Sequence, residues 1–135
     1  AYEYAQQCNF DIFVILNVFF PFKNPRYILK AVDTLNLFDL DSVVSVRPDD
    51  SVFYLHSGKG LVDRRPDAQT KHERDDLFRR SGGITVTTKS NLLSTKVSVS
   101  GKIGHIMIDQ ISSFELRTRL DLQLFSLIIN DKLHL

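Results

Sequence analysis

Residues 11–46 read DIFVILNVFFPFKNPRYILKAVDTLNLFDLDSVVSV, and this stretch decides the fold. Its first apolar run, residues 12–16, is unbroken and rich in β-branched side chains, which is typical of a strand covered on both faces. Residues 42–46 read SVVSV and predict a second short strand. A helical pattern fills the interval, so residues 11–46 predict a βαβ unit with parallel strands.

The helical interval has its own start signal and its own buried face. Asn24 can cap a helix, and Pro25 fits the first helical position, where a missing N–H costs nothing. Three apolar residues then recur at helical spacing and predict a stripe that packs against the sheet: Ile28, Val32 and Leu35.

The remaining elements are bounded by glycines and charges. A glycine turn, Ser57-Gly58-Lys59-Gly60, predicts a β-hairpin over residues 52–62, and a charged stretch, residues 63–80, predicts an exposed loop. Further elements are expected in this order: a strand over 84–87, a short helix over 90–93, a strand over 103–108, and a final helix that starts at the capping pair Thr118 and Asp121. We therefore expect one partial domain over 1–135, made of the βαβ unit 11–46, a hairpin and basic loop 52–80, and C-terminal strands and helix 83–131.

Composition excludes several classes of function. Seventeen basic and sixteen acidic residues give a formal net charge of +1, too balanced for a general nucleic-acid binder or membrane-surface binder. Cys8 is the single cysteine, so no intrachain disulfide can form, and a reducing, cytoplasmic setting is favoured. The most apolar segment, residues 12–22, is too short to span a bilayer, and the four histidines lack metal-ligand spacing.

Three polar segments can be interpreted in two ways each. The cations of the charged loop can bind phosphate or carboxylate, or they can be salt-bridged to the interleaved acids on a solvated surface. Ser81-Gly82-Gly83 can bring backbone amides close to a ligand, or it can be a simple turn before a strand. Glu115 and Arg117 lie two apart and share one face of an extended segment, where an ion pair forms more readily than a magnesium site.

Four blocks in order resemble the CMP-N-acylneuraminate (sialic acid) synthetase family of cytidylyltransferases. Residues 11–23 resemble the strand that ends in Leu-Gln-Pro-Thr-Ser-Pro-Leu-Arg, and residues 41–46 match Asp-Ser-Val-Val-Ser-Val. Residues 77–84 resemble Val-Tyr-Arg-Glu-Asn-Gly-Ala-Ile, and residues 113–118 with Asp121 resemble Ser-Ile-Asp-Ile-Asp-Thr followed by Asp. The resemblance implies an α/β, Rossmann-like fold of the nucleotide-sugar transferase type, with a mostly parallel sheet and a β-hairpin excursion.

The resemblance also implies an activity and a set of site residues. Members of this family join CTP to a sugar acid on Mg²⁺, releasing pyrophosphate, so CTP and a sialic-acid-like sugar acid are the implied partners. The hairpin 52–62 resembles a dimerisation segment and implies a homodimer. Glu115 stands at the first metal aspartate of the family, and Arg117 occupies the second. The implied substrate-binding residues are Asn17, Lys23, Lys71 (beside His72), Arg79, Ser81 and Gly82.

Several departures from the family pattern shape the functional expectation. Val18-Phe19-Phe20 replaces a Pro-Thr-Ser stretch, and the family's glycine-rich and basic loop for CTP phosphates would precede Ala1. We therefore expect a domain truncated at its N-terminus that is inactive as an isolated chain. The alternative is a degenerate, non-catalytic binding or dimerisation module.

Overall fold

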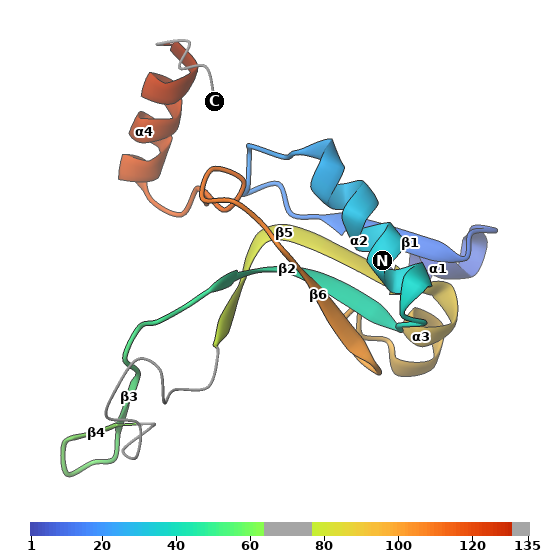
Figure 1. Cartoon of the computed structure of the whole chain (residues 1–135), viewed down its shortest axis with the longest axis horizontal. Helices are drawn as coiled ribbons and strands as arrows, with labels where there is room; N and C mark the ends of the chain where they lie inside the picture. Colours follow the sequence, from blue (N-terminus) through green and yellow to red (C-terminus); the bar gives the residue numbers. More distant parts are fainter. Residues whose placement is uncertain (64–76, 131–135) are drawn as a thin grey trace. The chain divides into compact units, whose positions relative to one another are not determined.

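A computed structural model describes residues 1–63 and 77–130. The chain divides into two compact units, one of residues 1–47 with the segment from residue 80 onward, the other of residues 48–79. The first unit contains the main sheet and the helices (Figure 1). The expectation of one domain over 1–135 stays a prediction.

A sheet of four strands is the framework of the first unit. β1 pairs antiparallel with β5, in a register that places Val14 opposite Val86. β2 pairs parallel with β6, with Val44 opposite His105. The order across the sheet is β1 (Ile12–Leu16), β5 (Phe78–Thr88), β2 (Ser42–Pro48) and β6 (Ile103–Met107).

The predicted βαβ unit is present, but its two strands are not neighbours. The Asp41 carbonyl accepts from the Thr88 N–H (3.1 Å), and the Ser45 hydroxyl accepts from the Ile84 N–H (3.0 Å). Residue numbers therefore fall along β5 as they rise along β2, so β5 is antiparallel to both β1 and β2. β1 and β2 therefore run parallel, as the sequence predicts, and a strand from much later in the chain lies between them.

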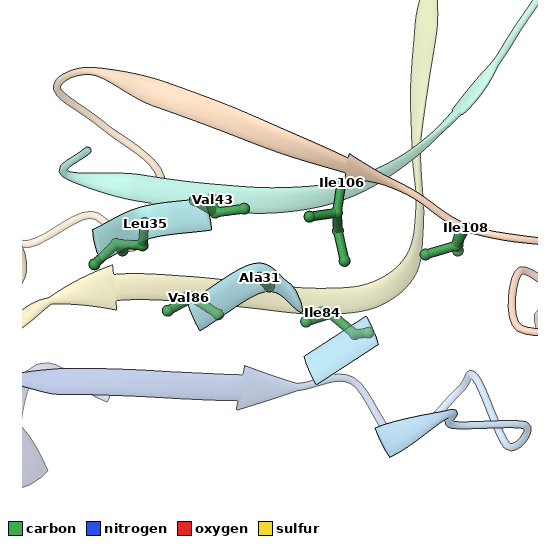
Figure 2. Packing of buried hydrophobic residues seen from close by; sticks show 7 residues of the cluster. All are labelled: Ala31, Leu35, Val43, Ile84, Val86, Ile106 and Ile108. Atoms are coloured by element: carbon green, nitrogen blue, oxygen red, sulfur yellow. The ribbon is translucent and has the colours of Figure 1, made fainter. Parts of the chain in front are cut away.

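Helix α2 (Pro25–Leu37) covers the core that these strands build. The Asn24 side chain caps its first turn by accepting from the Arg26 N–H (3.0 Å), as the sequence predicts. Leu35 is buried, and Ile28 and Val32 are partly buried against the same cluster. Figure 2 shows this cluster, which comprises Ala31, Leu35, Val43, Ile84, Val86, Ile106 and Ile108.

The described residues of the first unit form three further helices, of which the second and third are at predicted places. α1 (Tyr2–Gln7) packs against α3 (Lys89–Thr95), which is slightly longer than the predicted helix. α4 (Arg119–Asn130) begins at the predicted capping pair, where the Thr118 hydroxyl accepts from the Asp121 N–H and the Asp121 carboxylate accepts from the Thr118 N–H. None of the described helices combines the length and the apolarity needed to cross a membrane.

The second unit is built around the predicted hairpin. β3 (Tyr54–His56) pairs antiparallel with β4 (Leu61–Asp63), and the Ser57 N–H donates to the Gly60 carbonyl (3.0 Å) across the turn. Most of the predicted exposed loop, residues 64–76, lies outside the described residues, and its last three residues belong to β5, which begins at Phe78. Residues 78–80 are exposed and two of them are arginines, so the sequence there has no buried face to mark a strand.

Candidate functional site

A cleft of about 530 Å³ opens on the first unit at the carboxyl end of β1. The carboxyl ends of strands are the usual place for ligands in open α/β sheets. The apolar part of the lining consists of Ile15, Phe20 and the backbone of Gly83. The polar lining consists of Asn17, Arg80, Ser81, Thr85, Glu115 and Arg117.

The floor of the cleft is a kink in β5 made by two glycines. Gly82 and Gly83 both have left-handed backbones, with φ of +73° and +61°. A Cβ on Gly83 would lie 2.6 Å from the Phe20 ring and 2.7 Å from the Asn17 Cβ. Only glycine fits both the backbone angle and the space at position 83. The glycine pair therefore shapes the cleft floor and is more than a simple turn before a strand.

The Ser45 hydroxyl bonds backbone groups on both sides of this kink. It lies on β2, is fully buried, and accepts from the Ile84 N–H at 3.0 Å. It also bonds the Ser81 carbonyl. Unpaired buried peptide groups are costly, and this hydroxyl removes that cost beneath the cleft floor. Ser45 belongs to the Asp-Ser-Val-Val-Ser-Val block, so part of that block has a structural role.

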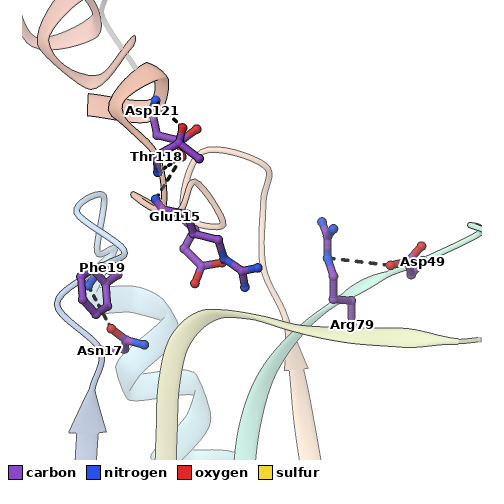
Figure 3. Close-up of polar contacts among 8 residues, drawn as sticks. Asn17, Phe19, Asp49, Arg79, Glu115, Thr118 and Asp121 are labelled. Carbon is purple, nitrogen blue, oxygen red and sulfur yellow. Dashed lines mark hydrogen bonds and ion pairs between the residues drawn. The ribbon is translucent and has the colours of Figure 1, made fainter. Parts of the chain in front are cut away.

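Asn17 is positioned by the first turn after β1. Its N–H donates to the Gly83 carbonyl (2.8 Å), and its side-chain oxygen accepts from the Phe19 N–H (2.9 Å; Figure 3). No described residue accepts a hydrogen bond from the amide nitrogen of the Asn17 side chain. Asn17 can therefore donate to a ligand oxygen in the cleft.

Lys23 does not line the cleft but ties its backbone together. Its ammonium donates to the carbonyls of Asn17 (2.8 Å), Phe20 (2.8 Å) and Gly82 (3.0 Å). An ammonium has three N–H donors, so all of them are used within the protein. Partial burial lowers the pKa of Lys23. The substrate-binding role implied for Lys23 stays a prediction, and the geometry gives it a positioning role.

Arg80 lines the cleft from β5, although the sequence predicts it in the charged loop. Its Nη2 donates to the Thr85 hydroxyl at 2.6 Å, across the glycine kink in β5. Thr85 is nearly fully buried, so it is a fixed anchor for the guanidinium. The alternation of apolar and polar residues along 84–87 could have been extended back to Arg80, but the glycine pair interrupts that pattern.

The opposite wall is the extended segment 115–117. The Leu116 N–H donates to the Phe19 carbonyl (2.8 Å), and the Arg117 N–H donates to the Asp121 carboxylate (3.0 Å). The Glu115 and Arg117 side chains form an ion pair at 2.7 Å, and Figure 3 shows Glu115 below the capping pair at the start of α4. The predicted ion pair is confirmed.

Hydrogen bonds to Asp121 stabilise its charged form. The Thr118 hydroxyl is the largest cause and the backbone N–H groups of Arg117 and Thr118 add to it, so the pKa of Asp121 lies below its ordinary value. The capping carboxylate thus stays ionised at neutral pH, where it fixes the backbone of the wall.

The residues of the cleft do not fit a magnesium ion. One carboxylate lines it, and an oxygen of that carboxylate is paired with Arg117. Magnesium needs several oxygen ligands in octahedral geometry, and a guanidinium repels it. Within residues 1–63 and 77–130, no group of three or more His, Cys, Asp or Glu side chains is arranged to bind a metal.

Two of the implied substrate residues are not among the described residues of the first unit. Arg79 belongs to the second unit and pairs with Asp49 at 3.8 Å, also drawn in Figure 3. Hydrogen bonds from Ser51, with a smaller contribution from Arg79, lower the pKa of Asp49. Lys71, with its neighbour His72, lies outside the described residues.

Ser81 and Gly82 differ in what they offer the cleft. Ser81 lines it but is almost fully buried. Gly82 is packed beneath it, because the space of a Cβ is taken by the Ile108 side chain and its carbonyl accepts from Lys23. The structure therefore brings Asn17, Ser81, Glu115 and Arg117 together at one cleft.

A second hollow of about 530 Å³ lies at the amino end of β1. Its lining includes Asp11, Asp39 and Lys89, and the Lys89 ammonium donates to the Cys8 carbonyl at 2.6 Å. One N–H of the ammonium is thus used within the protein, and the two carboxylates oppose an anionic ligand. The cleft at the carboxyl end carries the better case for a binding site.

Comparison with known proteins identifies the fold. No protein-family model and no curated protein matches the chain. The solved structures that match it include 4-diphosphocytidyl-2C-methyl-D-erythritol synthase from Anaerococcus prevotii (TM-score 0.64, 9% identity) and 2-C-methyl-D-erythritol 4-phosphate cytidylyltransferase from Thermus thermophilus (TM-score 0.60, 10% identity). The predicted α/β, Rossmann-like fold is confirmed, and these two enzymes share it.

The match covers different shares of the chains. It includes 96% of this chain but 64% of the first structure and 67% of the second. The chain therefore spans about two-thirds of the length of these enzymes. Neither structure is a sialic acid synthetase, so that part of the resemblance has no support from the comparisons.

Proposed function

We propose that this chain is the acceptor-binding part of a CTP-dependent cytidylyltransferase domain, and that its cleft binds an acidic sugar. The observation that carries the proposal is the pair of guanidinium groups, Arg80 and Arg117, in one cleft with the single carboxylate of Glu115. Guanidinium groups bind carboxylate and phosphate oxygens through parallel N–H donors. The acceptor in the name of the Thermus neighbour is likewise an anionic polyol, a phosphate ester.

Sialic acid is our choice within this class of acceptor. The ordered sequence blocks resemble the sialic acid synthetases, and Asn17 has a side-chain donor for a sugar hydroxyl. Ser81 and Thr85 add small polar surface to the lining. The proposal includes a cytoplasmic location, in keeping with the single Cys8.

We expect the isolated chain to bind an acceptor but not to turn over CTP. Two cations, one of them paired with Glu115, offset little of the charge of a triphosphate. Arg117 further opposes the divalent ion that the family reaction uses. Activity would then need groups that the described cleft does not contain.

A non-catalytic interaction module is the second candidate. The hairpin unit carries a run of apolar residues that are about half exposed: Val52, Phe53, Tyr54 and Leu55. Contiguous exposed apolar side chains mark contact surfaces, so a homodimer through this unit is part of this candidate. Light scattering of the purified chain would distinguish a dimer from a monomer, and replacing Phe53 by Asp should shift a dimer of this kind to the monomer.

Two assays on the same preparation test the main proposal. Pyrophosphate release from CTP and N-acetylneuraminic acid should stay at background, while calorimetry should detect binding of the acid and none of an uncharged hexose. Turnover at the rate of an intact synthetase would contradict the expected inactivity. Equal responses to the acid and to the uncharged hexose would contradict an acidic-sugar site.

A further inference from the structure

We propose that Arg117 supplies the positive charge that a divalent cation supplies in magnesium-dependent sites, so that the cleft binds an acidic sugar without metal. This inference rests on the proposed function, because it concerns how the same cleft holds the oxyanion of its ligand. It concerns binding alone and adds no chemical step.

The backbone of Arg117 is fixed before any ligand binds. Its own N–H donates to Asp121, and the preceding N–H, of Leu116, donates to the Phe19 carbonyl. Asp121 is in turn bonded by the N–H and the hydroxyl of Thr118. The wall is therefore tied both to the turn after β1 and to the start of α4.

The ion pair aims the guanidinium and leaves part of it free. The Glu115 carboxylate is paired with the Nε of Arg117 at 2.7 Å. No described residue bonds the two terminal nitrogens of the guanidinium. The Arg117 side chain is 74% exposed, whereas that of Glu115 is 26% exposed. The terminal nitrogens form a two-pronged donor edge suited to a carboxylate or a phosphate.

Arg80 provides a second cation from the other side of the cleft. Its bond to the buried Thr85 hydroxyl uses one N–H and leaves the Nε and Nη1 donors without a described partner. The negative charge of Glu115 offsets part of the repulsion between the two guanidinium groups, so both can line the same cleft. A bound oxyanion would offset the rest, since the lining has two positive groups and one negative group.

The same arrangement excludes a divalent ion. Such an ion would lie close to two guanidinium groups, with only one carboxylate to bind it, and one oxygen of that carboxylate is already paired with Arg117. Binding of an oxyanion is favoured instead, because each guanidinium attracts it. Affinity for the acidic sugar should therefore not depend on magnesium.

Calorimetric titration of the full chain with N-acetylneuraminic acid, in EDTA and in magnesium, tests this inference. Glycerol 3-phosphate in a parallel titration distinguishes a phosphate from a carboxylate as the preferred oxyanion. We expect the Kd of the preferred ligand to agree within about twofold between the two buffers. Arg117→Ala should weaken binding about tenfold or more in both buffers, in line with the loss of a charge-assisted contact.

Two further variants complete the experiment. Arg119→Ala removes an exposed arginine that does not line the cleft, and it should bind like the wild type. Arg117→Asp places a second carboxylate near Glu115, so its weakened binding should improve when magnesium is added. Far-UV circular dichroism of each variant checks that the fold is retained.

The possible failures are distinguishable. Wild-type binding that requires magnesium, or an Arg117→Ala variant that binds like the wild type, would overturn the inference and leave the acidic-sugar site standing. Absence of binding by the wild type in both buffers would overturn the proposed function itself, and the inference with it.

Discussion

The floor and the wall of the cleft are built in opposite ways. The floor is the Gly82-Gly83 kink of β5 with Ser45 beneath it, where left-handed backbones and buried hydroxyls leave no spare volume. The wall, residues 115–117, is more exposed and is positioned by an ion pair and a capping carboxylate. Substitutions in the floor should therefore act on folding, whereas substitutions in the wall should act mainly on the ligand.

The largest effect on stability is expected from Gly82→Ala. The new Cβ would meet the Ile108 side chain and lie 3.3 Å from the Ser112 carbonyl, on a backbone with φ of +73°. Left-handed strain and overpacking together should cost about 2–5 kcal/mol. Urea denaturation measures the loss as a lower midpoint.

Gly58→Ala is the matched control for that substitution. Gly58 also has a positive φ, +81°, but nothing lies within 4 Å of its Cβ position. It should cost no more than about 1–2 kcal/mol, from backbone strain alone. Equal midpoints for the two variants would show that the floor is not tightly packed.

Ser45→Ala should have the next largest effect. The substitution leaves the buried N–H of Ile84 without its acceptor, at a cost of about 1–3 kcal/mol. Ser126→Ala removes an exposed hydroxyl that donates to the Leu122 carbonyl of α4, and it should change stability by less than about 0.5 kcal/mol. Similar losses in both variants, measured by thermal unfolding, would contradict a special role for the hydroxyl under the kink.

Arg117→Ala should separate stability from binding. Because the ion pair with Glu115 is exposed on the arginine side, its loss should change the free energy of unfolding by less than about 1 kcal/mol. Urea denaturation measures that change, alongside the tenfold loss of ligand affinity expected above. A stability loss as large as that of Ser45→Ala would remove the distinction between wall and floor.

The smallest expected effect is the acid response of Asp121. Its pKa is lowered in the folded protein, so its contribution to stability is complete above the unfolded value, about 3.9, and is lost as pH falls through the folded value. Titration of the carboxyl carbon by NMR should show the lowered pKa. In Thr118→Ala, which lacks the hydroxyl donor, the pKa should move back toward the ordinary value, and an unchanged pKa would contradict this cause.

Local patterns were enough to predict most of the secondary structure. The Asn24 cap of α2, the hairpin turn and the Thr118 cap each depend on a few neighbouring residues, and each is confirmed. The place of β5 between β1 and β2 depends on pairing between distant residues, which local periodicity does not carry. The sequence predicts a loop at Arg80 for the same reason, because the pairing that makes this residue part of β5 is with distant residues.

The site shows the same limit. Asn17, Glu115 and Arg117 were selected through the family resemblance, and the fold brings them to one cleft although about a hundred residues separate them. Lys23 is the instructive exception. Its type and position suit a ligand contact, and only the folded backbone shows that its three donors are already used.

The most direct test is to map the binding site by amide NMR during titration with N-acetylneuraminic acid. We predict shifts concentrated on Asn17, Gly83 and residues 115–117, so that the floor and the wall respond together. Shifts confined to the hairpin 54–63, or to the hollow around Asp39 and Lys89, would contradict the assignment of the acidic-sugar site to this cleft.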